Sequence, residues 1–169
     1  MRIKLYLNRA VSLCLSGFLA GALAFQASGQ TATIQGDTYN SIHEAVAAAS
    51  AGDLVVLSAD TFALAEPLVL DLGIQLVGQG ESTVIQVAPS AAYGIYVRSS
   101  NVTLKDFKVD SPGATDQTAA IRVGTGNAPG ATPSTHFVNT AFSLEDVTIA
   151  GALVHGLELH GVQDANVLG

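Results

Sequence analysis

Cysteine is almost absent from this chain of 169 residues, because the single cysteine, Cys14, lies in an apolar run near the N-terminus. Beyond that run the chain can form neither disulfides nor thiolate metal sites. Its stability must therefore come from packing. Hydrophobic residues make up 49% of the chain, which is enough for a core.

Positive charge is also scarce. All 14 acidic residues lie beyond residue 30, where only four of the seven lysines and arginines remain, so the net charge of residues 30–169 is 4 − 14 = −10. Such a surface repels phosphate backbones, which argues against nucleic acid as a partner. It also disfavours polyanionic sugars, unless the cations gather in one place or a divalent metal mediates. The four cations are Arg98, Lys105, Lys108 and Arg122.

The first 29 residues have the pattern of a secretory signal peptide. A basic start precedes an apolar run at 10–25, and two small-residue cleavage patterns follow at 22–24 and 27–29. The alternative is an uncleaved membrane anchor, but 16 apolar residues fall short of the roughly 20 that a spanning helix needs. We therefore expect a secreted, periplasmic or cell-surface protein with no integral membrane segment after signal removal.

One helix is expected after the signal, at residues 41–49. Ser41 is a good N-cap, and Glu44 three residues later completes a capping box. Apolar residues recur at helical spacing and give the segment one apolar face. Gly52 is available for a left-handed C-cap.

The remainder of the chain has the pattern of short strands separated by Gly, Asn, Asp, Ser and Pro. One strand is expected before the helix, at 31–34. Later strands are expected at 54–57, 68–70, 74–77, 84–87, 94–97, 102–109, 120–123, 143–149, 156–159 and 165–167.

Two phrases recur along these strands. The phrase 101-NVTLKDFKV-109 returns as 141-AFSLEDVTI-149, and its copies align on Leu76, Leu104, Leu144 and Val167. A second phrase precedes each copy and ends at Leu70, Val97, Val123 and Leu159, in steps of 27, 26 and 36 residues. An insertion near 124–140 explains the long step. Such a period, with two or three short strands per repeat, indicates a solenoid.

The repeat has a physical reason. A corner at Lys105-Asp106, and again at Glu145-Asp146, shifts the alternation by one residue, so that apolar side chains face inward on both sides of the bend. Coils stacked about 4.8 Å apart would then bury an aliphatic column that no single coil can bury alone. We expect the helix to cover the first coil. Nothing comparable covers the last, so we expect either a longer protein or a partner there.

Three segments resemble the start of the right-handed parallel β-helix proteins of the pectin-lyase-like superfamily: 41-SIHEAVAAASAGDLVVLSADTF-62, 73-GIQLVGQGESTVI-85 and 94-GIYVRSSNVTLKDFKV-109. The resemblance covers residues 31–169. It implies an all-β, right-handed parallel β-helix domain over 30–169, with a short capping helix at its N-terminus.

The function implied by this resemblance is that of a carbohydrate-active protein. A polysaccharide lyase or epimerase acting on uronate-containing polysaccharide is the first expectation. The alternative is a noncatalytic surface or adhesive protein that binds glycans or other partners. The residue sets of the hydrolase members do not occur, and no complete catalytic set is present, so the sequence leaves open whether the protein is an enzyme.

Uronate lyases need a cation to neutralise the substrate carboxylate and a base to take the C5 proton. The resemblance therefore suggests Arg98, Lys105 and Arg122 as catalytic candidates. Calcium-dependent members add carboxylates, for which Asp106, Glu145 and Asp146 are candidates. The alternative for these residues is a solvated corner in which Lys105 and Glu145 form a surface ion pair.

Substrate-binding candidates come from aromatic and loop residues. Tyr96, with Tyr93, is suited to stack on sugar rings, and Asn127 and His136 of the insertion 124–137 are suited to contact sugar hydroxyls. The alternative for the insertion is a tolerated surface loop. Two histidines that flank 156–159, His155 and His160, are interpreted as ordinary turn residues.

We predict that export removes the first 24 or 29 residues, so that the exported chain begins at Phe25 or Gln30. Intact-mass measurement and N-terminal sequencing of the exported protein test this. An exported protein that still carries Met1 would contradict the signal peptide and favour the anchor.

Overall fold

The computed structural model describes residues 29–124 and 139–169. The predicted signal peptide, except Gly29, lies outside the described residues, as do most of the insertion and the candidates Asn127 and His136. No helix in the described part is long and apolar enough to cross a membrane.

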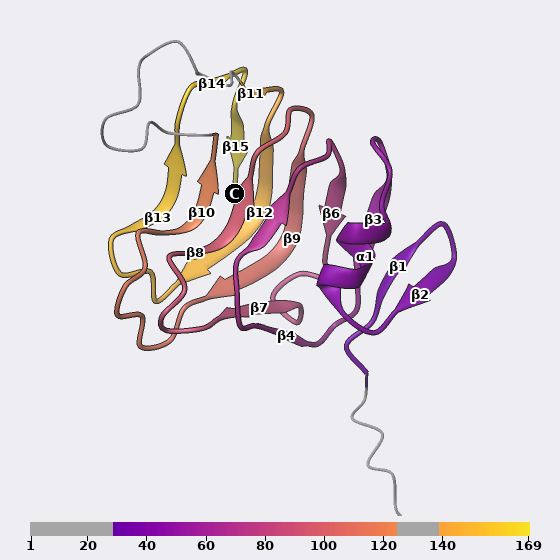
Figure 1. Ribbon diagram of the computed structural model, residues 1–169, viewed down its shortest axis with the longest axis horizontal. Coiled ribbons are helices and arrows are strands. Elements are labelled where there is room, and N and C mark those ends of the chain that lie inside the picture. Colours follow the sequence, from indigo (N-terminus) through magenta and orange to yellow (C-terminus); the bar gives the residue numbers. More distant parts are fainter. Residues whose placement is uncertain (1–28, 125–138) are drawn as a thin grey trace, which may run out of the picture.

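The described chain is mostly β-structure with one helix (Figure 1). In chain order the elements are β1 (Ala32–Ile34), β2 (Asp37–Tyr39), α1 (Ile42–Ala48), β3 (Leu54–Leu57), β4 (Thr61–Leu64), β5 (Leu68–Leu70), β6 (Gln75–Val77), β7 (Val84–Val87), β8 (Tyr93–Val97), β9 (Thr103–Asp110), β10 (Ala119–Val123), β11 (Asn139–Thr140), β12 (Ser143–Ala150), β13 (His155–Leu159), β14 (Val162–Gln163) and β15 (Asn166–Leu168). The strands predicted from the sequence are present, with ends shifted by at most one residue. The predictions missed β2, β4, β11 and β14.

The N-terminal strands form a hairpin that the sequence did not reveal. Gln35 and Gly36 connect β1 to β2, and both have positive φ angles, of 51° and 97°. Two such residues in succession favour the tight hairpin turn that matches strand twist. β1 pairs antiparallel with β2 on one side and with β3 on the other. The hairpin thus covers the edge of the first parallel strand.

The helix α1 begins as predicted and ends earlier than predicted. The Ser41 hydroxyl accepts a hydrogen bond from the Glu44 backbone N–H at 3.1 Å. The C-cap is Ala49 in an extended conformation, with φ −66° and ψ 150°. The predicted cap at Gly52 is therefore wrong, and Gly52 instead donates its N–H to the Gly73 carbonyl, where it links two successive repeats. Ile42 and Ala45 of α1 are buried in the core.

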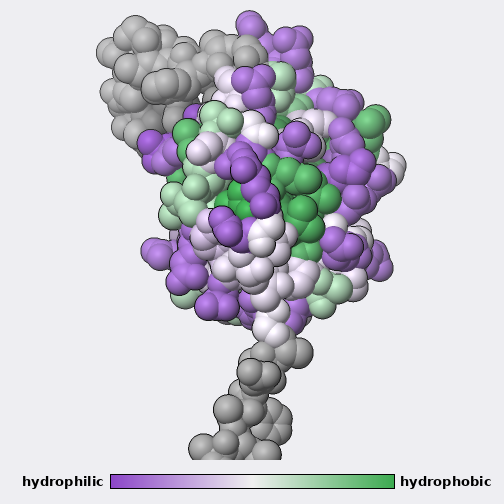
Figure 2. Space-filling view, turned by 90° about the vertical axis from the view of Figure 1, so that its right-hand side faces the viewer, coloured by the Kyte–Doolittle hydropathy of each residue, from purple (hydrophilic) through white to green (hydrophobic). Residues whose placement is uncertain are grey.

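Figure 2 looks onto this end of the molecule and shows a hydrophobic patch framed by hydrophilic residues. A groove of about 460 Å³ lies between α1 and β5, with Val46, Leu68 and Leu72 among its lining residues. The helix therefore covers the first layer only partly.

Every strand pair beyond α1 in the described chain is parallel. One sheet has the order β15-β12-β9-β6-β3-β1-β2, and a second has the order β13-β10-β8-β5. Neighbouring strands in each sheet are not consecutive in sequence, because the chain alternates between the two sheets. Each passage through both sheets adds one layer. The layers begin at β3, β5, β8, β10 and β13 (Figure 1).

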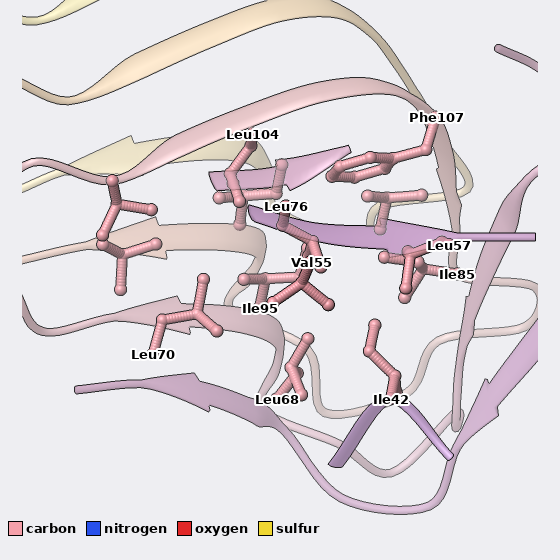
Figure 3. Close-up of a cluster of buried hydrophobic side chains, with 14 of the residues drawn as sticks. Ile42, Val55, Leu57, Leu68, Leu70, Leu76, Ile85, Ile95, Leu104 and Phe107 are labelled. Carbon is pink, nitrogen blue, oxygen red and sulfur yellow. The ribbon is translucent and has the colours of Figure 1, made fainter. Parts of the chain in front are cut away.

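The predicted register of both phrases is confirmed. Leu104 lies between Leu76 and Leu144, and Leu144 lies beside Val167. In the second sheet the column consists of Leu70, Val97, Val123 and Leu159. Figure 3 shows part of these columns, with Val55, Leu76 and Leu104 directed into one apolar interior. Each layer therefore buries the inward side chains of the layer before it.

The corners of the layers adopt the left-handed conformation. Asp106 in β9 and Asp146 in β12 have φ angles of 55° and 50°, which confirms the corners predicted there. Leu104 and Phe107, on the two sides of the first corner, are both buried, as the shift in alternation requires. Left-handed residues also precede β9, β12 and β15. These residues are Asn101, Ala141 and Asp164.

Ala141 is a poor residue for its corner. A φ of 57° places its Cβ close to the backbone, whereas asparagine adopts this conformation readily. We predict that Ala141→Asn stabilises the chain by about 1 kcal/mol and that Asn101→Ala destabilises it by a similar amount. Urea unfolding of both variants measures this. Equal midpoints for the two variants and the parent chain would contradict it.

Candidate functional site

The outward face of the sheet β5-β8-β10-β13 carries the most unusual group of polar side chains in the described chain. Register places Val69, Tyr96, Arg122 and Glu158 in one row across the four strands. Because side chains alternate along a strand, this row faces away from the core that buries the neighbouring column. Four residues from four layers thus form one continuous surface.

Arg122 lies at the centre of this surface. Its Nη1 donates a hydrogen bond to the Tyr93 hydroxyl at 2.6 Å. Its guanidinium carbon lies 5.0 Å from the ring centroid of Tyr93 and 5.9 Å from that of Tyr96. The two rings are themselves 5.3 Å apart. Arginine over aromatic faces is a favourable cation–π arrangement, and it leaves the Arg122 side chain only 13% exposed.

Glu158 connects Arg122 to a histidine. Its Oε2 lies 3.4 Å from Arg122 Nη1, and its Oε1 lies 2.6 Å from His160 Nε2. Burial by itself raises the pKa of the Glu158 carboxyl, but the His160 hydrogen bond and the Arg122 charge outweigh it, so the pKa is lowered overall. Glu158 is therefore ionised at neutral pH.

Hydrogen bonding in this cluster is incomplete. Arg122 Nε and Glu158 Oε2 are buried and have no hydrogen-bond partner, although Oε2 lies within ion-pair distance of the guanidinium. Buried polar atoms of charged groups are costly to leave unpaired. A hydroxyl or a water, which donates and accepts at once, can satisfy both.

Arg98 lies two residues after Tyr96, just beyond the end of β8. Its guanidinium carbon is 6.0 Å from the Tyr96 ring centroid, and its Nε pairs with Asp71 at 3.1 Å. Its side chain is 48% exposed, so it can reach a ligand. Arg98 also lines a polar groove of about 780 Å³ at the corner between the two sheets. The other polar side chains of this groove are Gln75, Ser99, Ser100, Asn101 and Asp71.

Gly73 keeps the corner beside this groove closely packed. A Cβ at this position would lie 2.5 Å from the Ser100 carbonyl oxygen, well inside van der Waals contact. Since both atoms belong to backbone turns of adjacent layers, a side chain here would push the layers apart. The groove therefore depends on glycine at this position.

Lys105, the third catalytic candidate, lies on the other sheet. It is the register partner of Glu145 and forms an ion pair with it at 3.1 Å. The hydrogen bond to Glu145, and then its charge, raise the pKa of Lys105, while a hydrogen bond from Ser143 and the one from Lys105 lower the pKa of Glu145. A lysine held in its protonated form is poorly suited to act as a base. The structure therefore brings together Arg98, Arg122 and Tyr96 and leaves Lys105 apart.

The calcium candidates lie around the same corner as Lys105. Within residues 29–124 and 139–169, no three His, Cys, Asp or Glu side chains gather closely enough to hold a metal ion. Asp106 and Asp146 occupy the left-handed corners, and Glu145 is already paired with Lys105. A calcium site formed by these three carboxylates stays a prediction.

Sequence reasoning did not single out Glu158, and it interpreted His160 as an ordinary turn residue. The signal was nevertheless present in the alignment of the second phrase. The residues immediately before Val97, Val123 and Leu159 must share one outward row, because their neighbours share the inward column. That rule gives Tyr96, Arg122 and Glu158.

We predict that Glu158 contributes stability that acid removes. Because its folded-state pKa lies below the ordinary value of 4.5, the contribution is fully present above that pH and is lost as the pH falls through the lower value. Glu158→Gln should lower the free energy of unfolding by about 1.5–3 kcal/mol at neutral pH. It should also make the free energy of unfolding fall less steeply as the pH drops below 4.5. Urea unfolding across a pH series tests this, with Glu66→Gln, an exposed carboxylate, as the control. The same steep fall in Glu158→Gln as in the parent chain would contradict it.

No protein-family model matches the chain, and no curated protein matches it. Among solved structures, it is similar to a mutant of AlyGC, described as an alginate lyase of the PL6 family, with 21% identity and a TM-score of 0.46. The match covers 76% of this chain and 19% of the other, so the chain spans about a fifth of that protein's length.

Proposed function

We propose that the described layers are the first coils of a right-handed parallel β-helix, and that the surface formed by Tyr96, Arg98 and Arg122 binds uronate-containing polysaccharide. The fold is supported by the parallel pairing of strands between successive layers and by the two columns of aliphatic side chains in register. The sequence resemblance to pectin-lyase-like proteins supports both parts of the proposal. We further propose that the protein acts outside the cytoplasm, where such polysaccharides occur.

The observation that carries the binding proposal is the position of the two arginines. Arg98 and Arg122 both lie near the half-buried Tyr96 ring, 6.0 and 5.9 Å from its centroid. A sugar ring stacked on Tyr96 would place its carboxylate within reach of Arg98, whose planar guanidinium matches a carboxylate in shape. On a chain with a net charge of −10 beyond the signal, two adjacent cations give the local attraction that an acidic sugar needs.

If the surface is catalytic, the reaction class is elimination or epimerisation at a uronate. Arg98 would neutralise the substrate carboxylate, which makes the C5 proton easier to remove. Lys105 does not serve as the base, because it lies on another sheet and is paired with Glu145. The imidazole of His160 is joined to Arg122 only through Glu158, whose Oε1 lies 2.6 Å from His160 Nε2 and whose Oε2 lies 3.4 Å from Arg122 Nη1.

A noncatalytic glycan-binding protein is the second candidate. It is favoured by the pairing of Arg122 with Glu158, since both groups already have a charged partner and fit a structural role. Binding and turnover must therefore be measured separately.

We predict that the chain binds alginate or pectate and that Tyr96→Ala and Arg98→Ala each weaken binding by about tenfold. Affinity electrophoresis in gels that contain each polysaccharide measures this. Lys108→Ala is the matched control, because it removes the same charge from a lysine on the other sheet that is paired with Asp110. Equal losses in Arg98→Ala and Lys108→Ala would show that net charge alone is responsible, and absence of binding by the parent chain would overturn the proposal.

Product formation distinguishes the catalytic candidate from the noncatalytic one. A lyase would release unsaturated uronates, which ultraviolet absorbance detects, and an epimerase would change the C5 configuration, which NMR detects. Binding with neither product would favour the noncatalytic candidate.

A further inference from the structure

The polar groove beside Arg98 lies where two corners of unequal length are stacked. Four residues, 71–74, connect β5 to β6 in one layer, and five residues, 98–102, connect β8 to β9 in the next. A longer corner stacked on a shorter one leaves a hollow, and the groove of about 780 Å³ is lined by both corners. This volume lies within the range of about 300–1,000 Å³ that is typical of ligand sites.

Two side-chain amides in this groove are exposed and have no hydrogen-bond partner in the described part of the chain. They belong to Gln75, on β6, and to Asn101, in the corner that leads to β9. Because β6 and β9 pair directly, with Gln75 beside Thr103, the two amides come from adjacent layers. An amide offers both donors and an acceptor, and a sugar hydroxyl likewise donates and accepts. The groove is therefore suited to a ligand rich in hydroxyls.

The charges of the groove balance. Among its lining residues, all of which the structure describes, Arg98 is the one cation and Asp71 is the one carboxylate. The two side chains pair through the Arg98 Nε at 3.1 Å. The groove therefore lacks the excess positive charge that would favour a free anion such as phosphate. The two terminal nitrogens of Arg98 have no partner among the described residues, so they are available to one carboxylate.

The groove is continuous with the surface proposed to bind uronates, because Arg98 belongs to both. Its guanidinium carbon lies 6.0 Å from the Tyr96 ring centroid, and the same side chain lines the groove. We infer that the groove is a second sugar subsite, which binds the unit next to the uronate stacked on Tyr96. The carboxylate of the first unit lies at Arg98, and the second unit is held through its ring hydroxyls by Gln75 and Asn101.

This inference rests on the proposed function and adds a specificity to it. The first subsite selects a carboxylate, whereas the second selects hydroxyls, because Asp71 already compensates the single cation of the groove. A disaccharide is the smallest ligand that fills both subsites. The affinity should therefore depend on the length of the oligosaccharide.

Titration calorimetry with galacturonate and mannuronate, each as the monosaccharide and as the trisaccharide, tests the inference. The parent chain should bind a trisaccharide at least about tenfold more tightly than its monosaccharide. This gain should persist in about 0.5 M salt, which screens exposed charges but not contacts to neutral hydroxyls. Gln75→Ala should bind the trisaccharide about tenfold more weakly and the monosaccharide as before, because Tyr96 and Arg98 remain.

Gln86→Ala is the matched control, because Gln86 is also an exposed glutamine on a strand, β7, but lies outside this groove. It should bind both forms of each sugar like the parent chain. Since Gln75 is exposed, Gln75→Ala should melt like the parent chain, which separates loss of binding from loss of folding.

A trisaccharide that binds no more tightly than its monosaccharide, or a gain that Gln75→Ala retains, would overturn the second subsite and leave the proposed function in place. A gain that salt abolishes would arise from charge instead of hydroxyls and would equally overturn it. Absence of binding by all four sugars would overturn the inference and the proposed function together.

Discussion

The structure depends on one interaction, the stacking of aliphatic side chains in register between adjacent parallel layers. A layer here consists of short strands and corners, and its inner face holds too few apolar atoms to form a core alone. Burial of Leu76 requires Leu104 above it, and burial of Leu104 requires Leu144. Stability is therefore shared between neighbours, as expected where each repeat contacts only the next.

The corners are the local condition for this stacking. Each corner must turn the chain without changing the distance between layers, and the left-handed conformation at Asp106 and Asp146 does so within a single residue. The same requirement selects glycine at Gly73 and Gly124, where a Cβ would collide with the backbone of the adjacent layer. The unfavourable left-handed backbone conformation at the corners is thus offset by the burial of apolar side chains along the strands.

The candidate site is a consequence of the same period. Once Val97, Val123 and Leu159 share an inward column, the residues before them must share an outward row. This row brings Tyr96, Arg122 and Glu158 together, although 62 residues separate the first from the last (158 − 96). The arginine is held by two aromatic rings of β8 and one carboxylate of β13, so its position is fixed by groups from the two neighbouring layers. Arg98, with only Asp71 as its ion-pair partner, keeps enough exposure to meet a ligand.

The sequence by itself determined the strands of the repeated phrases, their register and the start of the helix. These follow from local signals, namely a repeated aliphatic phrase, turn residues between strands and a serine cap. It could not determine the end of α1, because the extended conformation of Ala49 and the bond from Gly52 to Gly73 depend on the next layer. It missed β2 and β4, whose few residues become strands only because β1 and β7 lie beside them. Register also places Lys105 beside Glu145 and Arg122 beside Glu158. The contacts of Arg122 with Tyr93 and of Glu158 with His160 depend instead on side-chain directions, which only the tertiary structure decides.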